Sequence, residues 1–130
     1  MADNLINDEL THKIIGCAMK VHSALGNGFQ EVIYQRALEV EFSYNEVPFQ
    51  REQEFPIYYR GVDIGTRRVD FFVGNAVMVE LKAIVQLEDV HLAQAINYFE
   101  AYNMQIGLLL NFGSKSLTFK RLFNKSYKPI

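Results

Sequence analysis

The sequence predicts a single α/β domain in which a mixed β-sheet of about five strands is flanked by three helices. Three observations carry this prediction. Apolar residues recur at helical spacing up to about residue 44, β-branched and aromatic runs fill residues 49–83, and one helical segment then precedes two more apolar runs. A chain of 130 residues can bury a substantial core, so we expect one domain over residues 1–130.

Two helices are expected at the N-terminal end. The first has one apolar face at spacings of three and four residues, formed by Leu10, Ile14, Ala18, Val21 and Leu25. Asn7 is its expected N-cap. The second is expected from about Phe29 to Tyr44, with Ile33, Ala37 and Val40 packing inward.

The middle of the chain predicts three strands, at about residues 49–59, 64–73 and 76–83. Pro56 has no backbone N–H to donate and therefore favours an edge position for the first of them. A third helix is expected at about residues 89–103. The nearly continuous apolar run at 106–112 predicts a strand covered on both faces and parallel to the 76–83 strand, and the last run, 117–123, predicts an edge strand.

Composition excludes several classes of protein. There is no apolar run as long as a membrane-spanning helix, and the N-terminus resembles no secretory signal. Cys17 is the single cysteine, so an internal disulfide and a cysteine zinc cluster are excluded, and we expect a reducing cytoplasm. The net charge is −2, yet residues 101–130 carry five basic residues and no acid. That segment suits either a phosphate backbone or plain solvent exposure.

Charged residues on two of the apolar strands are the main anomaly. Asp70 lies among valine and phenylalanine residues, and Glu80 and Lys82 end a run of similar character. Burying such charges is costly unless they are paired or bound to metal. Because strand side chains alternate between faces, Glu80 and Lys82 share one face. The alternative is an edge strand with one solvated, charged face.

The hairpin between the two strands decides whether Asp70 joins that face. A three-residue loop over residues 74–76 places Asp70 opposite Glu80. A two-residue Gly74–Asn75 turn places it opposite Val79 and turns the two acids apart. Both registers are compatible with the sequence. If the acids converge, their oxygens suit Mg²⁺ or Mn²⁺.

These residues resemble a known superfamily. An aspartate, about ten residues and then Glu-x-Lys on the next strand is similar to the signature of the PD-(D/E)XK nucleases, with Val69 where that signature has proline. Four stretches also resemble the GxxExxY family within it: Gly28–Tyr34, Val79–Ala83, His91–Tyr98 and Gly107–Gly113. The resemblance as a whole covers nearly the entire chain, from about residue 8 to residue 123.

The resemblance implies a restriction-endonuclease-like fold and metal-dependent hydrolysis of phosphodiester bonds in nucleic acid. Asp70, Glu80 and Glu31 would bind Mg²⁺ or Mn²⁺, Lys82 would orient the attacking water, and Gln94 would support substrate or water. Without the resemblance, Glu31 would simply be a favourable charge in the first turn of its helix.

Three more residues are expected to contact substrate. Arg68 stands two residues before Asp70 and should share its face, whereas Arg67 should point away. His91 and Tyr98 share a helix face with Gln94. The alternative for the helix residues is that they satisfy buried backbone groups.

Two other classes of function stay open. One is a catalytically inactive nuclease-like fold that binds nucleic acid or protein, and the other is an assembly protein that forms a homodimer through its seven Tyr and ten Phe. The full acidic set favours hydrolysis over the inactive fold, and metal binding would separate hydrolysis from both alternatives. As partners we expect nucleic acid, DNA in preference to RNA, and no membrane.

Overall fold

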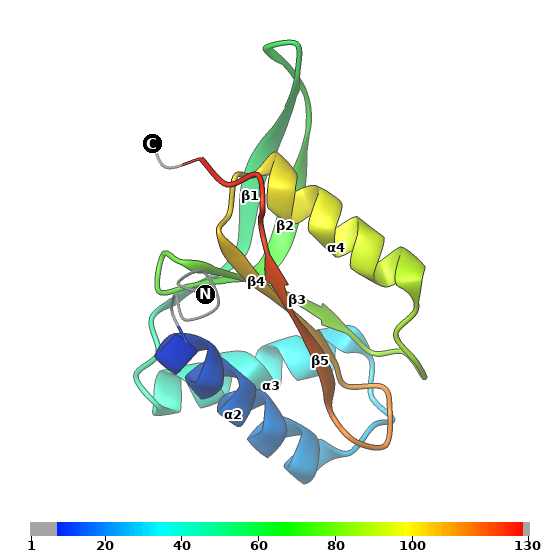
Figure 1. Ribbon diagram of the computed structural model, residues 1–130. Helices are drawn as coiled ribbons and strands as arrows, with labels where there is room; N and C mark the ends of the chain where they lie inside the picture. The colour runs from blue at the N-terminus through cyan, green and yellow to red at the C-terminus, as the bar shows by residue number, and fades with distance from the viewer. Residues whose placement is uncertain (1–7, 129–130) are drawn as a thin grey trace.

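The computed structural model describes residues 8–128, which form three helices and five strands (Figure 1). In chain order they are α2 (Asp8–Leu25), α3 (Glu31–Tyr44), β1 (Phe49–Tyr59), β2 (Val62–Val73), β3 (Val77–Lys82), α4 (Asp89–Ala101), β4 (Ile106–Asn111) and β5 (Thr118–Phe123). The expected α/β class is confirmed. Asn7, the expected N-cap, lies outside the described residues. None of the helices described is long and apolar enough to cross a membrane.

The five strands form one sheet whose spatial order equals the chain order, β1-β2-β3-β4-β5. β3 and β4 are parallel, and every other neighbouring pair is antiparallel. A parallel pair needs a long crossover, which the segment containing α4 supplies. β1 and β5 are the sheet edges, as Pro56 in β1 and the last apolar run predicted.

Each face of the sheet carries its own hydrophobic core. α2 and α3 cover one face and α4 covers the other (Figure 1). The helix-pair core joins α2 and α3 to side chains such as Phe71, Val79 and Leu110. The α4 core joins Phe99 to side chains that include Val69 and Met78. Glu80, on the central strand β3, therefore lies buried between two apolar layers.

The buried face of α3 differs from the predicted one. The structure buries Tyr34, Gln35, Leu38 and Phe42, whereas Ile33 and Val40 are 42% and 69% exposed. Tyr34 explains the rotation, because its ring stacks on Phe112 and its hydroxyl donates a hydrogen bond to the Gly26 carbonyl at 2.6 Å. Burying a large aromatic ring with its hydroxyl satisfied outweighs burying two aliphatic side chains.

β1 and β2 change faces part-way along their length. Phe71 packs in the helix-pair core, yet Val69, two residues earlier, packs in the α4 core. Residues two apart on a regular strand share a face, so the alternation is interrupted at Asp70. In β1, Glu52 adopts a left-handed φ of 55° at the matching position, between the pairs Arg51–Phe71 and Gln53–Val69. We call this position, Glu52 with Asp70, the strand crossing.

Candidate active site

Asp70 and Glu80 lie opposite each other on β2 and β3. The hairpin pairs Val73 with Val77 and Phe71 with Val79, so its loop has three residues. Of the two registers that the sequence allowed, this is the one that brings the acids together. The backbone pairing of β2 with β3 ends at Phe71–Val79, and beyond it the two strands are joined by hydrogen bonds from backbone N–H groups to the carboxylates. The Leu81 N–H donates to Asp70 Oδ2 at 2.8 Å, and the Asp70 N–H donates to Glu80 Oε1 at 3.4 Å.

Helix α3 and strand β2 each add a polar side chain to this pair. Gln35 on α3 donates from Nε2 to Asp70 Oδ1 at 2.9 Å. Arg67 on β2 places Nη2 3.7 Å from Glu80 Oε2. The Arg67 guanidinium carbon also lies 4.5 Å from the centre of the Tyr98 ring on α4, a cation–π contact. Asp70 is therefore bound by a side chain of α3, and Glu80 is linked through Arg67 to a side chain of α4.

Burial dominates the electrostatics of the acids. It raises the pKa of Glu80 to about 8, with the charge of Asp70 as the next cause and Arg67 opposing both. Burial also raises the pKa of Asp70, and burial followed by the charge of Asp70 raises that of Glu31. Lys82 favours the charged form of all three. Cations nearby therefore compensate the acids only in part.

Two polar atoms beside the acids are buried and lack a hydrogen-bond partner within the described residues: Arg67 Nε and the Tyr102 hydroxyl. The same setting raises the pKa of Tyr102 to about 12, first by burial. An unsatisfied buried donor costs roughly 1–3 kcal/mol, so such groups usually have a partner when the protein works. Donors of this kind would suit the oxygens of an anionic ligand.

The donor set fits a divalent metal. Asp70 and Glu80 supply hard oxygen donors, and the raised pKa of Glu80 shows that a further positive charge would be stabilising there. Within residues 8–128, no three acidic, histidine or cysteine side chains stand close enough to hold an ion by themselves. Glu31 therefore influences the pair through its charge, and water, backbone or substrate oxygens would have to complete the coordination.

The expected orientations of Arg67 and Arg68 are reversed in the structure. Arg67 faces Glu80, although it was expected to point away. Arg68 points to the other side and pairs with the exposed Glu54, at 3.1 Å from Nε to Oε1. The strand crossing is the cause, because a break in alternation at Asp70 exchanges the faces of all residues before it.

The three α4 residues that were expected to contact substrate or water, His91, Gln94 and Tyr98, differ from one another in exposure and in contacts. His91 lies at the third position of the helix, and its Nδ1 accepts the Glu88 N–H at 2.9 Å in a capping box. Gln94 is exposed on the same helix. Tyr98 is half-buried and reaches the acids through Arg67.

Three residues at the site were not among those that the sequence predicted to form it: Gln35, Arg67 and Tyr102. Gln35 had a usable signal, since it follows Glu31 by four residues and so shares its helix face. Arg67 had none, because a strand crossing cannot be inferred from alternation. Tyr102 lies just past the end of α4, as the residue that closes it.

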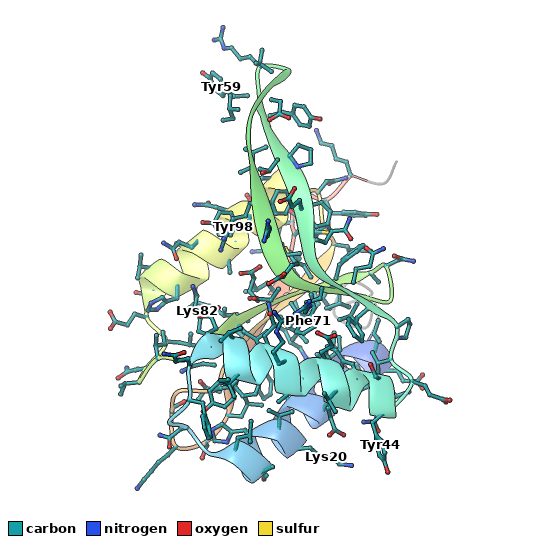
Figure 2. The ribbon with its side chains drawn as sticks, turned by 180° about the vertical axis from the view of Figure 1, so that it is seen from behind. Lys20, Tyr44, Tyr59, Phe71, Lys82 and Tyr98 are labelled. Atoms are coloured by element: carbon teal, nitrogen blue, oxygen red, sulfur yellow. The ribbon has the colours of Figure 1, made fainter. Side chains whose placement is uncertain are left out.

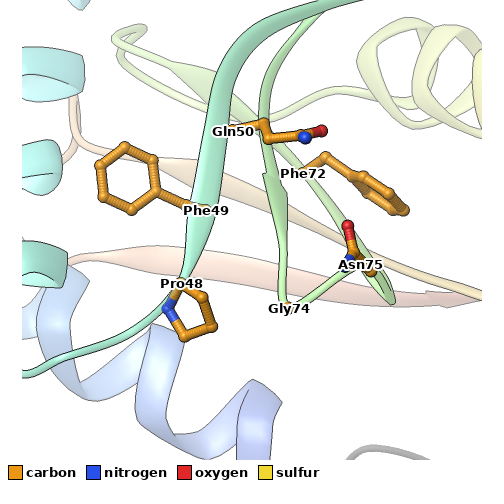
Figure 3. A pocket seen from close by; sticks show the side chains of 6 residues that line it. All are labelled: Pro48, Phe49, Gln50, Phe72, Gly74 and Asn75. Carbon is orange, nitrogen blue, oxygen red and sulfur yellow. The ribbon is translucent and has the colours of Figure 1, made fainter.

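One hollow elsewhere on the described surface does not involve these residues. It has a volume of about 270 Å³, lies beside the β2–β3 loop and is lined by Pro48, Phe49, Gln50, Phe72, Gly74 and Asn75 (Figure 3). No charged side chain lines it, which makes it unsuitable for a metal or a phosphate. This hollow is therefore a weaker candidate for chemistry than the acids.

Comparison with known proteins agrees with this geometry. The family model of the PD-(D/E)XK nuclease superfamily matches residues 8–122. This chain belongs to that superfamily. Asp70, Glu80 and Lys82 lie on the two strands that the hairpin register joins.

The crystal structure of SSO0001 has the same fold. The two superpose with a TM-score of 0.57 at 18% identity, over 72% of this chain and 50% of SSO0001. This chain thus spans half the length of that protein. No curated protein sequence matches it significantly.

Proposed function

We propose that this member of the superfamily is a divalent-metal-dependent nuclease that hydrolyses phosphodiester bonds, in DNA in preference to RNA. The observation that carries the proposal is the buried pair Asp70 and Glu80. The two residues lie opposite each other on β2 and β3, and each carboxylate accepts a hydrogen bond from the backbone of the other strand. Two acids buried this closely destabilise the fold unless a cation joins them, so they indicate binding rather than stability.

Each residue has a role within this proposal. Asp70 and Glu80 would hold Mg²⁺ or Mn²⁺, with Glu31 adding negative charge nearby. Bound there, the metal would polarise a phosphoryl oxygen and lower the pKa of a water molecule. Gln35 keeps Asp70 oriented through its hydrogen bond. Lys82 would orient the attacking water, and Gln94, exposed on α4, would contact substrate or water.

The motif order supports a finer assignment. We propose membership of the GxxExxY family, because Gly28 precedes α3 and Glu31 and Tyr34 lie in its first turn, with Glu31 coupled by charge to Asp70. A reducing cytoplasmic location is part of the proposal and is supported by the buried, single Cys17.

Calorimetric titration with Mn²⁺ tests the proposal. Wild type should bind, Glu80→Ala should lose binding, and Glu54→Ala, which removes an exposed acid outside the site, should bind as wild type. Cleavage of labelled DNA should follow the same order. Binding by Glu80→Ala equal to wild type would contradict the metal site. Metal binding without cleavage of any DNA or RNA would instead favour an inactive binding module.

A further inference from the structure

The β1–β2 hairpin continues beyond the rest of the sheet as a two-stranded ribbon, residues 56–66. In Figure 1 this ribbon is the green hairpin at the top of the view, which projects beyond α4. β1 and β2 stay paired up to Tyr59–Val62, whereas β3 pairs with β2 only over Phe71–Val73. A tight turn closes the ribbon, with Arg60 and Gly61 at φ of 50° and 78°. The ribbon is therefore an ordered arm.

Large apolar side chains crowd the outer part of this ribbon. Four are more than 60% exposed: Tyr58, Tyr59, Val62 and Ile64. An isolated two-stranded hairpin is only marginally stable in water, and large apolar side chains exposed together usually mark an interaction surface. Tyr58 and Tyr59 are consecutive on β1, so each face of the ribbon carries one tyrosine ring. The Arg60 guanidinium carbon lies 5.9 Å from the centre of the Tyr59 ring, so a cation accompanies the aromatic tip.

The side chains at the tip indicate the kind of partner. The ribbon holds one basic residue, Arg60, and one acid, Asp63, whose Oδ1 accepts the Gly65 N–H at 2.9 Å. Arg60 lies at the turn beside the exposed Tyr59 ring, so a cation and an aromatic face are presented together at the tip. A phosphate next to an exposed base is a partner that offers a contact to each.

The ribbon starts at the candidate active site. Arg67 at its base faces Glu80, and Figure 2 shows Tyr59 at the tip, well beyond Tyr98 and Lys82. Eight residues of strand separate Asp70 from Val62, a span of ~25 Å. That equals roughly seven nucleotides of one strand. A nucleic acid bound at the acids would thus reach the tip.

We propose that the ribbon binds unpaired bases of the nucleic acid substrate, with Tyr58 and Tyr59 stacking on them and Arg60 contacting a neighbouring phosphate. This inference rests on the proposed function for the position of the substrate. Aromatic faces can stack only on bases whose own faces are exposed. Reading paired bases in the major groove would instead require hydrogen-bonding side chains, and the tip has mostly apolar ones.

Fluorescence anisotropy in EDTA tests the proposal without metal or cleavage. The probes are a fluorescein-labelled forked DNA duplex and a blunt duplex of the same sequence. Tyr58→Ala/Tyr59→Ala should bind the forked probe at least about fivefold more weakly, since one stacked base contributes roughly five- to 150-fold. Its affinity for the blunt duplex should change much less. Tyr44→Ala, which removes an 83% exposed tyrosine on α3, is the matched control and should bind as wild type.

A second variant keeps the proposal falsifiable if the double variant does not fold. Arg60→Gln should weaken binding of the forked probe and reduce the slope of log affinity against log salt by about one. Unchanged binding of the forked probe by the folded variants would overturn the proposal. Sedimentation that shows a wild-type dimer dissociated by the ribbon variants would also overturn it, in favour of a contact between copies.

Failure of the proposed function has a separate readout. A wild type that binds the forked probe through its ribbon but shows neither Mn²⁺ binding nor cleavage would refute the nuclease and retain the ribbon contact. A wild type that cleaves DNA, with ribbon variants that cleave and bind every probe equally well, would retain the nuclease and refute the ribbon contact.

Discussion

The two faces of the sheet differ in how much apolar material covers them. Within residues 8–128, the helix-pair core contains eighteen buried residues, whereas the α4 core contains six. The large core provides most of the stability, and the small one leaves room for charged and hydroxyl-bearing side chains. Glu80, Arg67 and Tyr102 all lie on the α4 side. The difference shows that most of the candidate site lies on the side with fewer buried apolar residues.

The strand crossing connects these two layers at Asp70. From one side Gln35 of α3 binds Asp70, and from the other Arg67 links Glu80 to Tyr98 of α4. The buried Gln35 supports the site from the α3 side, and the partly exposed Arg67 lies on the α4 side. Substitutions on the two sides should therefore have different consequences.

The largest expected effect is in the helix-pair core. Phe71 is fully buried and makes edge-on contacts with Phe42 and Phe49. Phe71→Ala should lower the free energy of unfolding by roughly 3–5 kcal/mol, because it removes the ring and leaves a cavity. Met78→Ala in the α4 core should cost about 2 kcal/mol, since methionine packs less specifically. Urea unfolding of both variants measures the difference, and equal losses would contradict the unequal division of stability.

Glu80→Gln should make stability less dependent on pH. The folded-state pKa of Glu80 is about 8 against an ordinary 4.5, so the folded protein binds the extra proton. Stability from this residue is therefore complete below about pH 4.5 and is lost as pH rises to about 8. Above that pH, Glu80→Gln should melt roughly 5–10 °C higher than wild type. Thermal melts from pH 5 to pH 9 measure this, and a parallel pair of profiles would refute a buried, uncompensated Glu80.

Added metal sharpens the same comparison. At pH 8, Mn²⁺ should raise the melting temperature of wild type, because a ligand that binds the folded state alone stabilises it. The same addition should not affect Glu80→Gln, in which the donor charge is absent.

Gln35→Ala tests the support that comes from the helix-pair side. It removes the 2.9 Å hydrogen bond to Asp70, and a bond to a charged group contributes roughly 1.5–3 kcal/mol. We expect lower stability and weaker Mn²⁺ binding in calorimetry. Gln86→Ala, at an exposed loop position, is the control and should match wild type in both. A loss of stability alone would limit Gln35 to a structural role.

The smallest effect separates two adjacent arginines. Arg67→Ala removes the half-exposed cation beside Glu80, so it should cost about 1 kcal/mol at neutral pH and move the pH dependence of stability upward. Arg68→Ala breaks only an exposed pair with Glu54 and should change stability by at most about 0.5 kcal/mol. Urea unfolding at two pH values compares them. Identical behaviour would mean that the strand crossing does not direct Arg67 to the site.

Much of the fold was already determined by local patterns in the sequence. Helical spacing, the Gly-Asn hairpin signal and the continuous apolar run at 106–112 predicted all eight elements to within a few residues. Asp70, Glu80 and Lys82 were recognisable because charge is out of place on strands this apolar. Such signals depend on residues that are neighbours in the chain, so the chain alone carries them.

Only the tertiary structure decided which residues meet. Packing of Tyr34 set the buried face of α3 and so directed Gln35 to Asp70. The three-residue loop chose the register of the acids, and the strand crossing exchanged Arg67 for Arg68. Each outcome depends on which of several nearly equivalent faces buries more surface against distant parts of the chain. The sequence determined that a charged site should exist on these strands, and the packing of two unequal layers determined its members.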